Sequence, residues 1–203
     1  MTENQPSRAK AELRRQLLAA RRALSAETLS TAAGALSRSA LRLPELGSAR
    51  TVAAYVSIGS EPGTRELLDA LRASGTRVLL PVLLPDNDLD WAAYEGPDSL
   101  AEAAHPGKMR LLEPAGPRLG PDAVTGADAV LLPGLAVDRR GMRLGRGGGS
   151  YDRVLERLER AGAHPALVVL LYDDEVVARV PEEPHDHPVR AVATPSGVLR
   201  FSV

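Results

Sequence analysis

The sequence predicts an α/β fold with an open, mostly parallel sheet, helices on its faces and an antiparallel edge. Residues 129–132 (AVLL) and 166–171 (ALVVLL) are unbroken apolar runs of the length of a buried parallel strand. Residues 51–83 read as strand, helix and strand, which is a βαβ unit with parallel strands. The chain has 203 residues, a length compatible with one domain over residues 1–203.

The other elements follow from apolar spacing, which repeats every three to four residues in a helix and every two in a strand. Helices are predicted over residues 7–24, 26–41, 65–74, 151–161 and 172–180. Strands are predicted over residues 51–57, 77–83, 89–94, 107–114, 127–132, 166–171, 189–194 and 198–202, with 89–94 on the antiparallel edge. Residues 44–48 are predicted as a turn, 98–102 as a turn or short helix, and 115–126 as a long proline-rich loop.

Small polar residues and glycines mark the ends of the predicted helices. Ser25, Thr64 and Ser150 each stand directly before a helical pattern, where a hydroxyl can accept a hydrogen bond from a free backbone N–H. Gly75 and Gly162 follow two of the patterns and are natural helix stops.

A glycine-rich loop, PGLAVDRRGMRLGRGGGSYDR at residues 133–153, joins a predicted strand to the start of a predicted helix. Glycine lets backbone N–H groups come close to a ligand, and a helix start adds unpaired N–H groups and a partial positive charge. Arg143 and Arg146 add donors suited to phosphate oxygens, and Asp152 adds a hard oxygen ligand for Mg²⁺. The loop is therefore predicted to bind a phosphate or nucleotide; the alternative is a flexible surface loop.

Two common phosphate motifs do not describe this loop. No Gly-Lys-Ser/Thr follows the glycines, so the loop is not a P-loop. Ser150 stands where a dinucleotide fingerprint has its third glycine.

Composition excludes several classes of protein. The formal net charge is −1, from 25 basic and 26 acidic residues, which argues against a nucleic-acid partner. The chain has no cysteine, so it has no disulfide framework and no thiolate zinc site. The start of the chain is polar and no apolar run is long enough to span a membrane, so we expect a cytoplasmic protein without a membrane partner.

Two further patterns leave alternatives open. Lys10 and Arg14 lie four residues apart on one helix face, which by pattern alone indicates a solvated basic face. His185 and His187 flank Asp186 in a proline-rich segment, which is either a weak metal motif or a proline-fixed loop.

The longer string LPGLAVDxxGxRLGRGGGxYDR resembles the signature of the 5-formyltetrahydrofolate cyclo-ligase family. The similarity runs nearly end to end and includes AKxxLR at residues 9–14, the loop 57–61, LEP at 112–114 and PHD at 184–186. It implies a three-layer α/β fold like that of NagB/RpiA/CoA-transferase-like proteins. It also implies that MgATP drives cyclisation of 5-formyltetrahydrofolate to 5,10-methenyltetrahydrofolate, with release of ADP and phosphate.

The resemblance assigns roles to residues. It implies ATP-binding positions at Lys10, Arg14, Arg143, Leu144, Gly145, Arg146, Gly147, Gly148, Gly149, Ser150 and Tyr151. It implies folate-binding positions at Val56, Glu61, Arg146, Gly147, Gly148, Gly149 and Ser150, and magnesium-associated acids at Asp152 and Asp186. Arg146, Lys10 and Glu61 are the expected catalytic residues, which reverses the interpretation of Lys10 and Arg14 as a solvated face. The expected partners are the two substrates, and the expected assembly is a monomer.

Three positions depart from the family pattern. Ser150 replaces a usual aromatic, Val137 replaces a common phenylalanine, and Arg190 replaces a frequent aspartate. Arg190 either weakens the metal end of the site or pairs with a nearby acid such as Asp186. The departures motivate one alternative function, a non-catalytic nucleotide-binding protein. A sugar-phosphate isomerase or acyl-transfer enzyme on a similar sheet is another.

Overall fold

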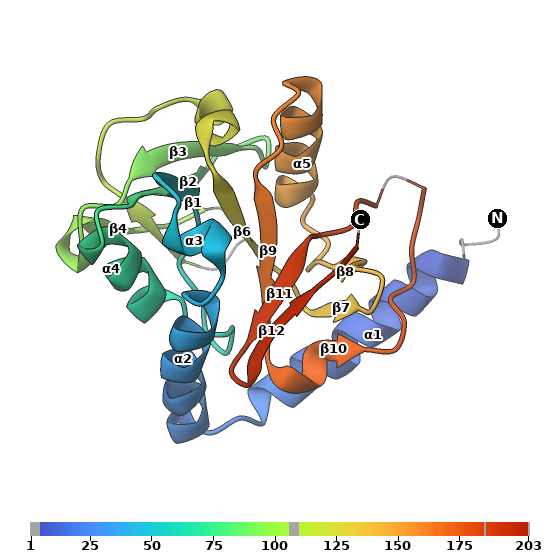
Figure 1. The fold of residues 1–203 in the computed structure, drawn as a ribbon. Coiled ribbons are helices and arrows are strands. Elements are labelled where there is room, and N and C mark those ends of the chain that lie inside the picture. The colour runs from blue at the N-terminus through green and yellow to red at the C-terminus, as the bar shows by residue number, and fades with distance from the viewer. Residues whose placement is uncertain (1–4, 106–109, 185, 203) are drawn as a thin grey trace.

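The computed structural model describes residues 5–105, 110–184 and 186–202 around a seven-stranded sheet (Figure 1). Its strands are β1 (Thr51–Ala53), β2 (Arg77–Leu83), β3 (Leu89–Ala93), β6 (Ala129–Pro133), β9 (Ala166–Leu170), β11 (Ala191–Thr194) and β12 (Gly197–Arg200). The order is β12-β11-β9-β6-β1-β2-β3. Neighbours from β11 to β2 pair in parallel, while β12 and β3 are antiparallel at the two edges. The predicted α/β sheet with an antiparallel edge is confirmed.

Helices cover both faces of this sheet, which gives three layers (Figure 1). One face carries α2 (Ala26–Ala40), α3 (Pro44–Gly47) and α4 (Arg65–Ala73); the other carries α5 (Ser150–Arg160) and the 3₁₀ turn η2 (Pro121–Gly126). Alternate residues of β6 enter the two cores: Leu131 packs with the first group and Leu132 with the second. This alternation follows from the two-residue period of a strand.

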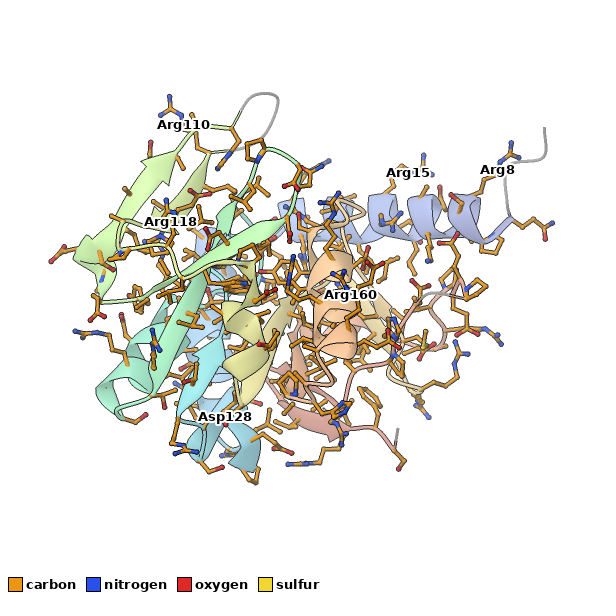
Figure 2. The ribbon with its side chains drawn as sticks, turned by 90° about the horizontal axis from the view of Figure 1, so that it is seen from above. Arg8, Arg15, Arg110, Arg118, Asp128 and Arg160 are labelled. Carbon is orange, nitrogen blue, oxygen red and sulfur yellow. The ribbon has the colours of Figure 1, made fainter. Side chains whose placement is uncertain are left out.

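A second, small sheet supports the first helix. Its strands are β7 (Ala136–Asp138), β8 (Arg143–Leu144) and β10 (Val176–Val177), in the order β10-β7-β8. Helix α1 (Gln5–Arg22) runs beside this sheet in Figure 1, and its leucines pack with Leu135 and Leu144. Figure 2 shows Arg8 and Arg15 on the side of α1 that points away from the rest of the chain. No helix among the described residues is both long and apolar enough to cross a membrane.

Several predicted elements are shorter than expected or of another type. The strand predicted over 51–57 ends at Ala53, because the backbone of the next residues bonds to Thr64: its hydroxyl donates to Tyr55 O and accepts from Ser57 N. The turn predicted at 44–48 is the short helix α3. The 3₁₀ turn η1 (Pro97–Ser99) leads into β4 (Leu100–Ala103), which pairs antiparallel with β5 (Leu111–Pro114). The start of the strand predicted at 107–114 lies outside the described residues.

The helix predicted over 172–180 is wrong. The segment forms the 3₁₀ turn η3 (Asp173–Glu175) and then β10. Two tertiary interactions override the local pattern: the Glu175 carboxylate binds Arg21, and the β-branched Val176 and Val177 pair with β7.

Some of the predicted helix ends agree with the structure and others do not. The Ser25 hydroxyl accepts from Thr28 N at 3.1 Å, so this N-cap is confirmed. Thr64 occupies the N-cap position of α4 but makes no side-chain cap hydrogen bond. The Ser150 N-cap is wrong: Gly149 holds that position and Ser150 is the first helical residue. Gly162 follows α5 with φ of 62°, as expected for a glycine stop.

Candidate functional site

The strand order of the main sheet reverses between β1 and β6. From β1 the chain moves outward to β2 on one side, and from β6 it moves to β9 on the other. In open α/β sheets ligands bind beyond the carboxyl ends of the strands at such a point. A cavity of about 250 Å³ lies there, lined by Tyr55 and Val56 after β1, by Leu83 at the end of β2 and by Pro133 at the end of β6.

The walls of this cavity, which we call the apolar cavity, are mostly hydrocarbon with a few polar groups. Its polar side chains include Glu61, Glu113, Arg146 and Tyr151. The Tyr151 hydroxyl is buried without a hydrogen-bond partner in the described part of the chain. Burial also raises the pKa of Tyr151, so the hydroxyl keeps its proton and can donate to a ligand. Apolar walls with sparse polar groups are typical of a site for a flat organic ligand.

Glu61 is held in the apolar cavity by the loop after β1. Its Oε2 accepts from Ile58 N at 2.8 Å, and its Oε1 lies 3.4 Å from Arg146 Nη1. Glu61 is only 8% exposed, whereas the Arg146 side chain is 42% exposed. The arginine can therefore move toward a ligand while the carboxylate stays fixed by its backbone contact.

A second cavity of about 190 Å³, the basic cavity, lies between α1 and the glycine-rich loop. It takes its name from three cationic side chains of α1 and β8, Lys10, Arg14 and Arg143. Four acids also line it, namely Asp152, Glu156, Glu183 and Asp186. Residues 143, 145, 147 and 152 line both cavities. The loop that runs from β8 to α5 is thus the wall that the two cavities share.

Acidic residues from the end of the chain hold Lys10 in the basic cavity. Its Nζ donates to Glu183 Oε2 and Asp186 Oδ2, both at 2.7 Å. Burial by itself would lower the pKa of Lys10, but the two carboxylates outweigh it and raise the pKa. Lys10 is only 6% exposed, so the solvated basic face indicated by pattern alone is wrong.

The two arginines beside the shared wall are held by carbonyl groups. Arg14 Nε donates to Gly145 O at 2.9 Å, and Arg143 Nη1 donates to Pro133 O at 3.0 Å. Arg143 Nη2 also lies 3.4 Å from Asp152 Oδ1. Burial lowers the pKa of Arg143, although a guanidinium in a protein stays charged. Backbone carbonyls of the loop and of β6 thus fix both guanidinium groups beside the shared wall.

The start of α5 faces both cavities. Gly149 takes φ of 78°, a left-handed conformation that turns the chain into the helix, and Ser150 begins α5. Gly147 takes φ of 90°, and a side chain there would meet the Arg14 guanidinium at 3.4 Å. Gly147 therefore lets the loop backbone come close to the Arg14 guanidinium two residues before the N-cap of α5, and a cation beside a helix N-terminus suits an anion.

Comparison with known proteins decides the family. The profile of the 5-formyltetrahydrofolate cyclo-ligase family matches residues 6–195. This chain belongs to that family. The 5-formyltetrahydrofolate cyclo-ligase of Mycolicibacterium smegmatis is 42% identical over 93% of this chain and 94% of the relative. The Escherichia coli K12 cyclo-ligase is 32% identical over 89% of this chain and 97% of the relative. The solution structure of Aquifex aeolicus 5,10-methenyltetrahydrofolate synthetase superposes with a TM-score of 0.78 at 28% identity, covering 96% and 93% of the two chains.

The structure brings together the residues that the cyclo-ligase resemblance assigned. The assigned residues that line the apolar cavity are Val56, Glu61, Arg143, Gly145, Arg146, Gly147, Gly148, Gly149, Ser150, Tyr151 and Asp152. Those that line the basic cavity are Lys10, Arg14, Arg143, Leu144, Gly145, Gly147, Asp152 and Asp186. Their roles in binding and catalysis remain predictions.

The three departures from the cyclo-ligase pattern lie in different surroundings. Val137 is fully buried in the core beneath α5, so its substitution is a packing change. Ser150 lines the apolar cavity, where it leaves the space of an aromatic ring. Arg190 is exposed and lines neither cavity.

The described residues around the His185–His187 motif do not form a metal centre. His185 lies outside the described residues, and His187 is 3.8 Å from Glu159. Among residues 5–105, 110–184 and 186–202, no group of three or more His, Cys, Asp or Glu side chains is placed to hold a metal ion.

Sequence reasoning missed three acidic residues near the site. Glu183 binds Lys10, Glu113 lines the apolar cavity, and Glu175 binds Arg21 beneath the site. Only Glu113 carried a local signal, since it lies in the LEP segment shared with the family. The partners of the other two lie more than 150 residues away in sequence.

Proposed function

We propose that the two cavities bind 5-formyltetrahydrofolate and ATP, and that the protein catalyses the ATP-dependent cyclisation of the folate to 5,10-methenyltetrahydrofolate. The observation that carries this proposal is the shared glycine-rich wall: one side faces an apolar cavity and the other a basic cavity. The ring system of the folate suits the first and the triphosphate suits the second. Family membership supplies the reaction.

The basic cavity would hold the triphosphate. Lys10, Arg14 and Arg143 place three cations around it, and the backbone at Gly145 and Gly147 would add neutral donors. Lys10 would exchange its carboxylate partners for phosphate oxygens. Phosphoryl transfer depends mostly on positioning and charge neutralisation, which this arrangement provides without a protein nucleophile.

The reaction would begin with attack of the N5-formyl oxygen on the γ-phosphorus, with ADP as the leaving group. N10 then attacks the activated formyl carbon, the five-membered ring closes and phosphate leaves. Glu61 would orient the ring, and Arg146 would move from Glu61 to the transferring phosphoryl group, because its guanidinium is exposed on the shared wall. Donors aimed at developing charge are worth about 10²–10³ in rate each.

The acids at the basic cavity fit a nucleotide-dependent magnesium ion. Mg²⁺ in nucleotide sites is usually held by one or two carboxylates together with phosphates and water. Asp152 and Asp186, the two acids that the resemblance assigns to magnesium, are among the four that line the cavity. Magnesium would be held by these two residues and would neutralise charge on the phosphates.

One assay tests the proposal. Purified protein with 5-formyltetrahydrofolate and MgATP should form methenyltetrahydrofolate, seen by absorbance, together with equimolar ADP. Omission of either substrate should abolish the signal. ATP binding without folate-dependent product would contradict the proposal and favour a non-catalytic nucleotide-binding protein.

A further inference from the structure

Glu113 is a buried acid in the wall of the apolar cavity with only half of its carboxylate engaged. It lies on β5 and is 7% exposed. Oε1 accepts from Leu83 N at 3.0 Å and lies 2.7 Å from His105 Nε2. Oε2 receives no hydrogen bond from the described residues, so its lone pairs are available. Oε2 is also not among the fully buried side-chain atoms of the described residues, so it keeps accessible surface at which it can accept a hydrogen bond from a ligand.

The surroundings of Glu113 define the ligand that it can receive. Leu83, Leu89, Leu111 and Leu112 form apolar walls around it. A ligand here must be flat and apolar on its faces and must carry N–H donors on its edge. Pockets for whole drug-sized ligands span roughly 300–1,000 Å³. The apolar cavity, at about 250 Å³, is smaller, so it suits a ring system whose substituents extend outside.

We propose that Glu113 recognises the aminopyrimidine edge of the folate ring by accepting N–H hydrogen bonds at Oε2. The inference rests on the proposed function, since the 2-amino-4-oxopyrimidine half of 5-formyltetrahydrofolate presents adjacent N–H donors. Hydrogen bonds to a charged acceptor are about twice as strong as neutral ones. His105 and Leu83 N hold Oε1 and so act as positioning groups that aim Oε2.

The same contact would set the direction of the ring in the cavity. Glu61 is joined to Arg146 of the shared wall, whereas Glu113 is joined to β2 and to His105. The formyl group must lie near the shared wall to reach phosphate. The pyrimidine half lies at the opposite end of the ring system from the N10 side chain and would therefore occupy the Glu113 end.

The test uses Glu113→Gln, which keeps an oxygen for Leu83 N but removes the charge. We expect the KM for 5-formyltetrahydrofolate and its Kd by calorimetry without ATP to rise about 10- to 100-fold. The KM for ATP and the melting temperature should change little. Glu102→Gln on the paired strand β4 is the matched control, because Glu102 is 65% exposed and binds only Arg110 at the surface. If Glu113 has only a structural role, Glu113→Gln should change the melting temperature, and the KM for 5-formyltetrahydrofolate should not rise relative to the KM for ATP.

A substrate analogue that lacks the 2-amino group gives a second, mutation-free arm. Wild-type protein should bind this analogue about tenfold more weakly than 5-formyltetrahydrofolate, and Glu113→Gln should hardly distinguish the two. Equal binding of both ligands by wild-type protein would overturn the inference even if the variant did not fold. Wild-type turnover measured in parallel keeps the outcomes apart: an active wild type with unchanged folate affinity in Glu113→Gln refutes only the role of Glu113.

Discussion

Arg21 and Glu175 form a two-point ion pair beneath the site, with N–O distances of 2.6 and 2.8 Å and both side chains under 5% exposed. Arg21 Nη2 also donates to Gly134 O, at the start of the glycine-rich loop. Tyr172 packs its ring 5.7 Å from the Arg21 guanidinium and donates its hydroxyl to Ser60 O. This cluster therefore joins the helix that carries Lys10 to both loops that form the cavities.

Removal of one partner of this buried pair should be costly. Arg21→Ala leaves the Glu175 carboxylate buried without its cation, so we expect a loss of about 3–5 kcal/mol in the free energy of unfolding, measured with urea. The control is Arg200→Ala at the Arg200–Glu45 pair, where the side chains are 54% and 31% exposed. That variant should lose less than about 1 kcal/mol. Similar losses in the two variants would mean that Arg21 contributes no more than a surface charge.

The buried carboxylate of Asp138 should make part of the free energy of unfolding depend on pH in the acid range. Both of its oxygens accept hydrogen bonds. Met142 N donates at 3.2 Å, within the loop between β7 and β8, and Val180 N donates at 3.0 Å from the segment after β10. Burial by itself would raise the pKa of Asp138, but these bonds and those from Arg140 outweigh it and lower the pKa below the ordinary 3.8. The stabilisation is therefore complete above pH 3.8 and is lost as the pH falls through the lower folded value.

We expect Asp138→Asn to lose about 2 kcal/mol at pH 7, since bonds to a charged group are replaced by weaker ones. The difference from wild type should narrow as the pH falls below 3.8, the ordinary value. Urea unfolding at several pH values measures both effects. Asp98→Asn at the exposed turn η1 is the control and should be close to neutral. A difference that stays constant with pH would show that the pKa of Asp138 is not lowered by folding.

Sequence reasoning succeeded where the signal was local. The strand 77–83 was predicted with both of its ends, because seven residues of β-type composition are bounded by Gly75 and by Pro85. Helix α5 was predicted from four apolar residues on one face, and Val154, Leu155 and Leu158 are indeed buried. The glycine-rich loop was predicted as a binding site because glycines and arginines clustered before a helix are not expected in a buried core.

Distant contacts account for the failures. The small sheet was missed because β8 has two residues and β10 pairs with β7, almost forty residues earlier. Lys10 was interpreted from pattern as solvated, yet its partners Glu183 and Asp186 lie 173 and 176 residues away. No window of the sequence contains both halves of these contacts. Gly149 rather than Ser150 caps α5 because the turn needs a positive φ, which a spacing argument does not reveal.

Gly149 offers a test of the helix start as an anion site. Gly149→Ala places a side chain at φ of 78°, which should cost about 1–2 kcal/mol and shift the start of α5, where Asp152 lines the basic cavity. We expect the KM for ATP to rise by about tenfold or more while the KM for folate rises less. Gly148→Ala is the matched control, because a methyl group there meets no atom within 4 Å. Equal KM values for ATP in the two variants would remove the Gly149 turn from nucleotide binding.

Arg146 offers a test of the catalytic assignment. Its side chain is 42% exposed and touches Glu61 only at 3.4 Å, so its loss should hardly change stability. Arg146→Ala should lower kcat by about 10²–10³-fold if the guanidinium stabilises the transferring phosphoryl group. Steady-state formation of methenyltetrahydrofolate provides the measurement, and Arg139→Ala, an exposed arginine of the preceding turn, provides the control. A kcat/KM near that of wild type would exclude Arg146 from the mechanism.

Asp152 offers a test of the magnesium assignment. Asp152 lies in the first turn of α5. Its side chain is 59% exposed and its Oδ1 lies 3.4 Å from Arg143 Nη2, so Asp152→Asn should fold normally. If its carboxylate helps to hold magnesium, the variant should need about tenfold more magnesium for half-maximal rate at fixed ATP, and calorimetry should show a matching loss of MgATP affinity. Glu159→Gln, on the same helix and 72% exposed, changes the charge equally and should leave the magnesium dependence unaltered. If both variants shift equally, the effect is one of net charge near the nucleotide and Asp152 is no metal ligand.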